Sequence, residues 1–223
     1  MSKGARKTGR ARRKRPPDLP IRRRQTRPVK TKVLIVGEGR ETEPNYFRGL
    51  RSEDAVAHKF AVNVTKGRGV SPEAAVGQAI TLQQQARSRE ETYDEVWCVL
   101  DVEGPANRAS LGRAAKAAAE NEITLCLSNP CFEVWLLAHF ETRARAYSEC
   151  DAVIVQLNTH WRRHCGQNYQ KNDKRVYERV SERTRTAIAN AQWVRKTHHR
   201  GKANTADCNS ATEVYLLVQK LIG

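Results

Sequence analysis

Short apolar runs alternate with amphipathic stretches through the first two-thirds of this chain. Most of the runs lack polar alternation and are rich in β-branched side chains, which is typical of strands buried on both faces of a parallel sheet. The expected strands cover residues 32–37, 60–65, 95–100 and 123–127. The intervening stretches repeat apolar positions at helical spacing. This alternation predicts an α/β fold with a mostly parallel sheet flanked by helices.

Turn and capping signals place the helices. Pro44 suits the first turn of a helix ending near residue 51, and Ser71-Pro72-Glu73 begins one that runs to about residue 87. Further helices are expected over 107–120 and over 131–140, the second after an Asn129-Pro130 cap. Because the 131–140 segment is apolar nearly all round, we expect it to be buried.

The regular alternation stops after Glu141. Helical stretches are expected over 149–160 and 175–193, and a capping box, Ser210-Ala211-Thr212-Glu213, predicts a closing helix. We therefore predict one domain over 31–223, with an α/β core to residue 141 and a C-terminal helical extension over 142–223. Residues 1–30 are predicted to be a separate arm.

Charge distinguishes this arm from the rest of the chain. Of the formal net charge of +16, residues 1–30 carry +12, from 13 Lys/Arg and the single acid Asp18, while 31–223 carry only +4. Few apolar side chains and several prolines predict that the basic N-terminal arm is disordered. It suits contact with nucleic-acid phosphates without sequence specificity, although a solvated tail that aids solubility is the alternative. The arm residues expected to bind are Arg12, Arg13, Lys14, Arg15, Arg22, Arg23 and Arg24.

Composition also indicates the cellular compartment. No apolar run approaches the roughly 20 residues of a membrane span, and the basic N-terminus lacks the apolar segment of a secretory signal, so a cytoplasmic protein without membrane contact is expected. The six cysteines show no CxxC spacing, and three lie within apolar runs. They are interpreted as small buried hydrophobic residues, and disulfides are not expected.

Acidic residues follow two of the expected strands directly. Glu38 comes after the first strand, and Asp101 with Glu103 ends the third. Since the carboxyl ends of parallel strands meet at one edge of a sheet, these carboxylates should lie together. Crowded oxygen ligands suit Mg²⁺ or Mn²⁺, and such a metal in a very basic chain points to phosphate chemistry.

Each acid also has a structural interpretation. Glu38 and Glu41 could favour a helix dipole, although Gly37 and Gly39 around Glu38 suit close approach of a ligand instead. Asp101 could simply begin a turn. Glu133, at the start of an apolar helix, either favours the dipole or joins the metal cluster; both interpretations stay open.

Basic and aromatic candidates are less specific. Lys66, Arg68 and Lys171 could bind nucleic acid or stabilise charge on a phosphate, and Gly67-Arg68-Gly69 could cradle a phosphate or be an ordinary loop. His160, His164 and Cys165 have spacing that superficially suggests zinc but lack a second ligand pair. His139 is interpreted as a core residue. Core positions are also expected for the tryptophans, Trp97, Trp135, Trp161 and Trp193, although Trp161 could instead stack on a base.

Three ordered blocks resemble the RloB family: V-G-E-G-x-x-T-E-P-N-Y-F, D-E-V-W-C-V-L-D-V-E and S-N-P-C-F-E-V-W-L-L-A-H-F. The resemblance covers roughly 31–223 and implies a Toprim-like fold, in which Glu38 and Asp101 match the acidic positions. Glu103 departs from the pattern, since Asp is usual there, but the longer side chain can still bind Mg²⁺. The family also implies bacterial restriction or abortive-infection loci and a neighbouring AAA-type ATPase as partner.

Together these features predict a metal-dependent nuclease, of DNA or RNA, in antiphage defence. Glu38, Asp101 and Glu103 would be catalytic, and the same residues with Glu133 would bind the metal, Glu38 also being the candidate general base. The alternative is a catalytically inactive nucleic-acid-binding subunit of a defence complex. A primase-like polymerase is a weaker third hypothesis, because no nucleotide-binding module is evident.

Overall fold

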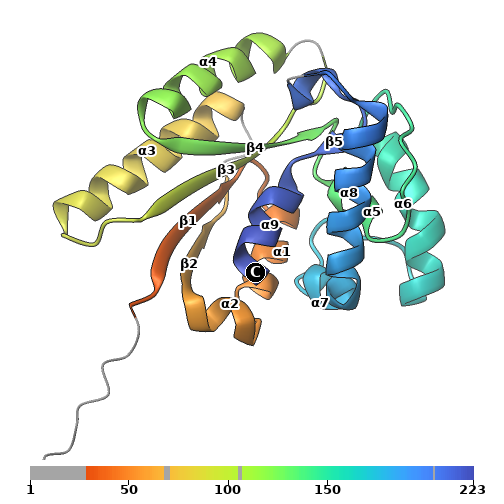
Figure 1. Ribbon diagram of the computed structural model, residues 1–223, viewed down its shortest axis with the longest axis horizontal. Helices are drawn as coiled ribbons and strands as arrows, with labels where there is room; N and C mark the ends of the chain where they lie inside the picture. Colours follow the sequence, from red (N-terminus) through yellow and green to blue (C-terminus); the bar gives the residue numbers. More distant parts are fainter. Residues whose placement is uncertain (1–28, 68–70, 105–106, 203) are drawn as a thin grey trace, which may run out of the picture.

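The described strands form one five-stranded sheet in the order β2-β1-β3-β4-β5 (Figure 1). The computed structural model describes residues 29–67, 71–104, 107–202 and 204–223. The strands are β1 Thr31–Gly37, β2 Phe60–Thr65, β3 Glu95–Asp101, β4 Ile123–Asn129 and β5 Ala211–Thr212. The first four are parallel, and β5 pairs antiparallel with β4. The predicted α/β class, a mostly parallel sheet flanked by helices, is confirmed.

Strand β1 shows why the apolar runs are continuous. Val33 and Ile35 pack into one hydrophobic cluster, while Leu34 and Val36 pack into a second cluster on the other face of the sheet. All four side chains are buried. A strand with both faces covered has no solvent side, so its sequence shows no polar alternation.

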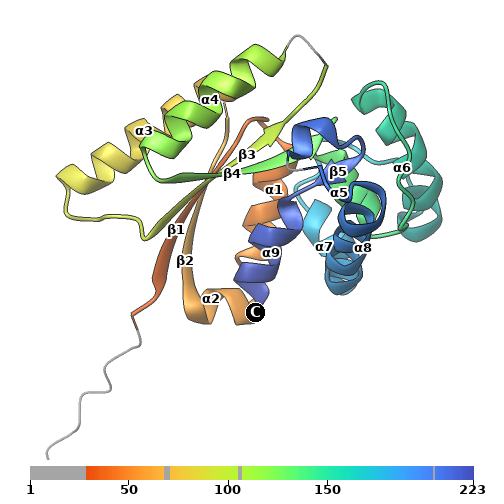
Figure 2. The same ribbon diagram turned by 45° about the horizontal axis from the view of Figure 1, so that its top comes forward.

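Helices cover both faces of the sheet. Figures 1 and 2 show α3 (Pro72–Ser88) and α4 (Arg108–Glu120) on one face. The other face carries α1 (Thr42–Leu50) and α9 (Val214–Ile222). The short α2 (Asp54–Lys59) precedes β2 and was not predicted, because it is six residues long and buries only Val56.

A second group of helices lies beside the sheet, on the right of Figure 1. Its members are α5 Glu133–Ala138, α6 Cys150–Cys165, α7 Val176–Val180 and α8 Thr184–His198. Trp135 and Trp161 are fully buried among them, so Trp161 cannot stack on a base. Trp193 was expected in the core but is 46% exposed, because it lies on the outer face of α8. The chain then returns to the sheet through β5 and α9.

Two predicted caps are wrong. Glu213 does not complete a capping box: its carboxylate accepts hydrogen bonds from the Leu127 backbone N–H, at 3.0 Å, and from the Thr205 hydroxyl. Thr212 supplies the side-chain acceptor for Val214 N at 3.2 Å. Asn129 does not cap α5 either, since its amide donates to the carbonyl oxygen of Ala206 at 2.8 Å. Both side chains join β4 to the C-terminal segment instead.

The expectation of no disulfide is also wrong. Cys131, in the loop after β4, is bonded to Cys150, the first residue of α6, with a Cα–Cα distance of 5.6 Å. The partners are 19 positions apart in the sequence, and the other four cysteines are free. No local spacing motif indicates this pair, because the fold alone brings the two segments together.

Candidate functional site

The order of the strands brings Glu38 and Asp101 together. The chain leaves β1 toward β2 on one side, and the later β3 lies on the other side of β1. Ligands bind in the crevice at such a switch point, outside the carboxyl ends of the strands. The Glu38 backbone N–H donates to Val99 O at 2.9 Å, which extends the hydrogen bonding between β1 and β3 by one residue. The Glu38 side chain accepts a hydrogen bond at Oε2 from the Asp101 backbone N–H, at 3.1 Å. The two predicted acids are therefore adjacent.

A cavity of about 270 Å³ opens at this point. Its acidic lining consists of Glu38, Glu41, Glu43, Asp101, Glu103 and Glu133, and its basic lining consists of Arg40 and Lys171. All four residues predicted as metal ligands thus line one cavity.

Glu43 is a further acidic residue that the sequence reasoning missed. Its side chain is 4% exposed and its Oε1 accepts from the Gly39 backbone N–H at 3.0 Å. A Cβ at position 39 would lie 2.4 Å from Glu43 Oε2, so a larger residue there would displace the Glu43 carboxylate. An acid in the first turn of a helix is ordinary, and the flanking glycine was the one available signal.

Glu133 faces the cavity from the start of α5. It is 3% exposed, and its Oε1 accepts a hydrogen bond from the Tyr169 hydroxyl at 2.9 Å. Lys171 Nζ lies 3.9 Å from the same oxygen. The Tyr169 hydroxyl also lies 3.0 Å from Thr42 Oγ1. These two hydroxyl residues were not predicted, because Tyr169 lies in a loop far along the chain and Thr42 resembles an ordinary helix start.

Glu103 is placed differently from the other acids. It is exposed and has a positive φ of 47°, and its Oε2 accepts a hydrogen bond from Asn107 Nδ2 at 2.8 Å. Its carboxylate therefore lies at the rim of the cavity and already has a donor.

Acidic residues outnumber basic residues in the lining of this cavity by six to two. Burial raises the pKa of Glu38 to about 7. The hydrogen bond from the Asp101 backbone N–H lowers this pKa in part, and the negative charges of Glu103 and Glu43 raise it further. Burial and repulsion from the four neighbouring glutamates raise the pKa of Asp101 well above its usual value. The pKa of Glu43 is raised mainly by burial. Asp101 Oδ1 is buried without a hydrogen-bond partner. A divalent cation with oxygen ligands fits such a set.

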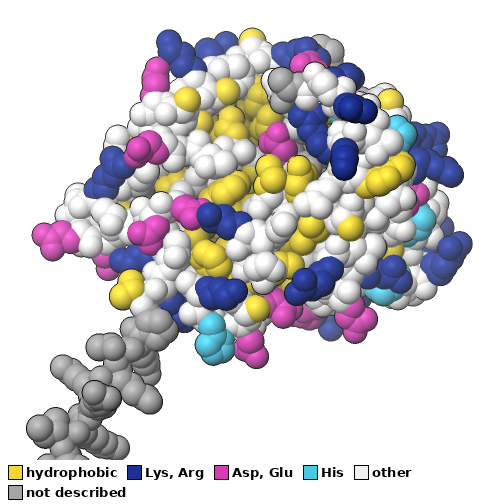
Figure 3. All heavy atoms as spheres, in the orientation of Figure 1, with side chains coloured by type: hydrophobic (Ala, Val, Ile, Leu, Met, Phe, Trp, Pro, Cys, Tyr) yellow, Lys and Arg dark blue, Asp and Glu magenta, His cyan; other side chains and the backbone are white. Residues whose placement is uncertain are grey.

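The predicted basic residues have separate positions. Lys171 lines the cavity, whereas Lys66 forms an exposed ion pair with Glu41 at 3.3 Å. Gly67 packs against the turn after β1, since a Cβ there would lie 2.0 Å from Glu38 O. Arg68, Gly69 and residues 1–28 of the basic arm, including Arg12–Arg15 and Arg22–Arg24, lie outside the described residues. Figure 3 shows basic and acidic side chains interspersed on the face in view, as expected for a nearly balanced body.

The histidine candidates have structural contacts. His160 Nε2 lies 3.0 Å from Glu141 Oε2, and His164 Nε2 lies 2.9 Å from Arg179 O. They do not form a metal-ligand group with Cys165 within the described part of the chain. His139 is buried, with its Nδ1 3.0 Å from Trp135 O, and burial lowers its pKa to about 4. It is a core histidine.

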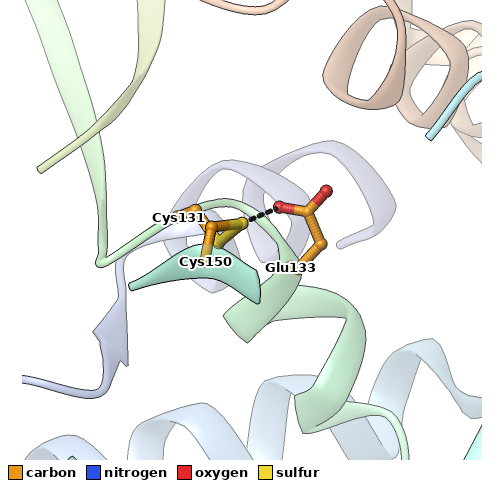
Figure 4. Close-up of side chains that lie close together, drawn as sticks. All are labelled: Cys131, Glu133 and Cys150. Atoms are coloured by element: carbon orange, nitrogen blue, oxygen red, sulfur yellow. Dashed lines mark hydrogen bonds between the residues drawn. A yellow bond between two sulfur atoms is a disulfide. The ribbon is translucent and has the colours of Figure 1, made fainter. Parts of the chain in front are cut away.

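The one tight group of candidate metal ligands found among the described residues consists of Cys131, Glu133 and Cys150. One ligand atom from each lies within 4.8 Å of the others. Figure 4 shows the disulfide with the Glu133 carboxylate turned toward it, Oε2 being 3.1 Å from Cys150 Sγ. This group adjoins the acidic cavity through Glu133.

Fold and site together define an α/β domain with an acidic cavity at the carboxyl ends of its parallel strands. The model of the RloB-like protein family matches residues 33–221, and the chain belongs to this family. Comparisons with curated proteins and with solved structures gave no match. Within the described ranges, the helices lack the length and apolar character needed to cross a bilayer.

The Glu38 pKa predicts how stability changes with pH in metal-free protein. Because the folded-state pKa, about 7, exceeds the ordinary 4.5, protonated Glu38 stabilises the fold. That contribution is fully present below pH 4.5 and is lost as pH rises through 7. It amounts to at most about 3 kcal/mol, since the side chain is partly solvated. Urea unfolding in the presence of a chelator measures the free energy of unfolding at each pH. From pH 5 to pH 8 this free energy should fall less in Glu38→Gln than in wild type or in the exposed control Glu120→Gln. Equal losses in all three would contradict the pKa assignment.

Proposed function

We propose that this protein is a Mg²⁺- or Mn²⁺-dependent nuclease that acts in antiphage defence with an ATPase partner. The observation that carries the proposal is the convergence of Glu38, Glu43, Asp101 and Glu133 on one cavity. Their mutual repulsion favours a divalent cation, and Lys171 beside them favours an anionic substrate. Phosphodiester hydrolysis is a reaction class that combines these two requirements.

Each residue has a role that its surroundings support. Asp101 and Glu133 would hold the ion, with Glu103 as a ligand at the rim and Glu43 positioning the turn through Gly39. Glu38, with a pKa near 7, suits the general base that takes a proton from the attacking water. Lys171 would bind a non-bridging phosphate oxygen. A bound Mg²⁺ or Mn²⁺ would supply Lewis-acid stabilisation of the charge that develops on the phosphate.

A second candidate is the inactive nucleic-acid-binding subunit. The observation that favours it is the hydrogen bond from Asn107 to Glu103, which engages the third acidic position at the rim of the cavity. Mg²⁺ commonly keeps several waters and uses only one or two carboxylates, so the loss of Glu103 as a ligand still allows binding by the buried acids.

Calorimetric titration with Mn²⁺ separates these two functions. For a nuclease we expect saturable binding to the full-length protein, and Asp101→Asn should weaken it at least tenfold, whereas the exposed control Glu120→Gln should bind as wild type does. The same proteins should then be assayed on single- and double-stranded DNA and RNA, with and without the ATPase of the neighbouring locus. Absence of binding at millimolar Mn²⁺ would favour the inactive subunit.

A further inference from the structure

We propose that Cys131, Cys150 and Glu133 are the ligands of a redox-controlled site for Zn²⁺, which the dithiol form binds and the disulfide form excludes. The three side chains come from the loop after β4, the first residue of α5 and the first residue of α6. Cys131 and Glu133 are buried and Cys150 is partly buried. The metal site itself does not depend on the proposed nuclease activity.

The ligand types and their spacing suit zinc. Thiolate sulfur at about 2.3 Å and carboxylate oxygen at about 2.0–2.2 Å are its usual ligands. Two sulfurs in a tetrahedral shell would lie about 3.8 Å apart. The Cα–Cα distance of 5.6 Å lets rotation of the cysteine side chains reach that separation, and Glu133 Oε2 already lies 3.1 Å from Cys150 Sγ.

The surroundings balance the charge of the bound form. Two thiolates and a carboxylate carry three negative charges, which Zn²⁺ and one lysine neutralise. Lys171 Nζ lies 3.9 Å from both Cys150 Sγ and Glu133 Oε1. Its side chain is 57% exposed, so it can adjust its position. Three protein ligands leave a fourth position for water from the cavity side.

Tyr169 orients the shared carboxylate. Its hydroxyl donates to Glu133 Oε1, which leaves Oε2 turned toward the sulfurs (Figure 4). Such outer contacts fix a metal ligand, and their loss typically weakens metal binding 10- to 100-fold. Tyr169 is therefore a positioning residue for this site.

Oxidation would remove two of the three ligands. Two thiolates lose two electrons as the Cys131–Cys150 bond forms, and a small-molecule disulfide such as oxidised glutathione accepts them with two protons to become two thiols. Zn²⁺ is then released. Because Glu133 also lines the acidic cavity, zinc would compete with Mg²⁺ for it; this regulatory consequence rests on the proposed function.

Cobalt spectroscopy on the full-length protein tests the site without any activity assay. Reduced, metal-stripped protein should show a sulfur-to-Co²⁺ charge-transfer band that saturates near one equivalent and disappears when Zn²⁺ is added. Oxidised protein should lack the band, and thiol counting after unfolding should give four thiols before reduction and six after.

Variants identify the ligands. Cys131→Ser and Cys150→Ser should lose the band, the control Cys165→Ser should keep it, and Tyr169→Phe should keep it with Zn²⁺ affinity lowered 10- to 100-fold. No band in the reduced protein, a band in both cysteine variants or in the oxidised form, or six thiols before reduction would overturn the proposal. If the cysteine variants do not fold, the wild-type redox comparison and Tyr169→Phe still decide it. If the wild-type protein shows the cobalt band but no nuclease activity, the proposed nuclease function is wrong and the zinc site still stands.

Discussion

Asp101→Asn and Glu38→Gln are each expected to reduce metal-dependent cleavage by about a thousandfold or more, with the fold unchanged. A metal-assisted step gains several kcal/mol of charge stabilisation, and about 4 kcal/mol corresponds to a thousandfold in rate. Asparagine keeps the shape of Asp101 but removes the charge that holds a cation. Glutamine at position 38 can still accept from the Asp101 backbone N–H, so it removes the base and keeps the contact.

The measurement is single-turnover cleavage at saturating Mn²⁺, together with unfolding of each variant. Glu120→Gln is the matched control, because Glu120 is exposed at the end of α4, on the face of the sheet opposite α1 and α9. In metal-free protein at pH 8, both active-site variants should be at least as stable as wild type, since each replaces an acid whose charged form is disfavoured by burial and by the neighbouring glutamates. Cleavage that persists in both variants would exclude the carboxylates as the catalytic site.

Burial decides how much of the fold the sequence predicts. Strands β1, β3 and β4 lie inside the sheet, so their continuous apolar runs locate them, and the rule for strand ends then places Glu38 beside Asp101. Strand β5 was not predicted, because two residues paired at an edge leave no periodic signal. Trp193 was placed in the core from its residue type, but the outer face of α8 leaves it exposed.

The site was only partly predictable, because several of its residues are brought together by contacts between distant segments. Glu43 resembles an ordinary acid in a first helical turn, and only the three-dimensional contact with Gly39 shows that its carboxylate faces the cavity. The Cys131–Cys150 pair and Tyr169 depend on how α6 and the loop after it pack against α5. Such contacts between distant segments follow from tertiary packing, which no local pattern encodes.

Deletion of residues 1–30 is expected to weaken binding to duplex DNA by orders of magnitude near physiological salt. The arm carries +12 of the net charge of +16. Each phosphate contact releases condensed counterions and contributes about 0.9 to the slope of log affinity against log salt. If about half of the 13 basic residues engage at once, deletion should flatten that slope by about 5 or 6. Sequence preference should not change, because phosphate contacts position a protein without specifying a sequence.

Salt titrations of binding, on duplexes of different sequence, measure this effect. A variant with the arm at full length but with its Lys and Arg replaced by Gln separates charge from length, and should behave like the deletion. Turnover at saturating substrate should survive both changes, because the described residues that line the acidic cavity, from Glu38 to Lys171, belong to the folded body. Equal salt slopes for the full-length, neutral-arm and truncated proteins would identify the arm as a solvated tail, and the phosphate contacts would then have to come from the folded body.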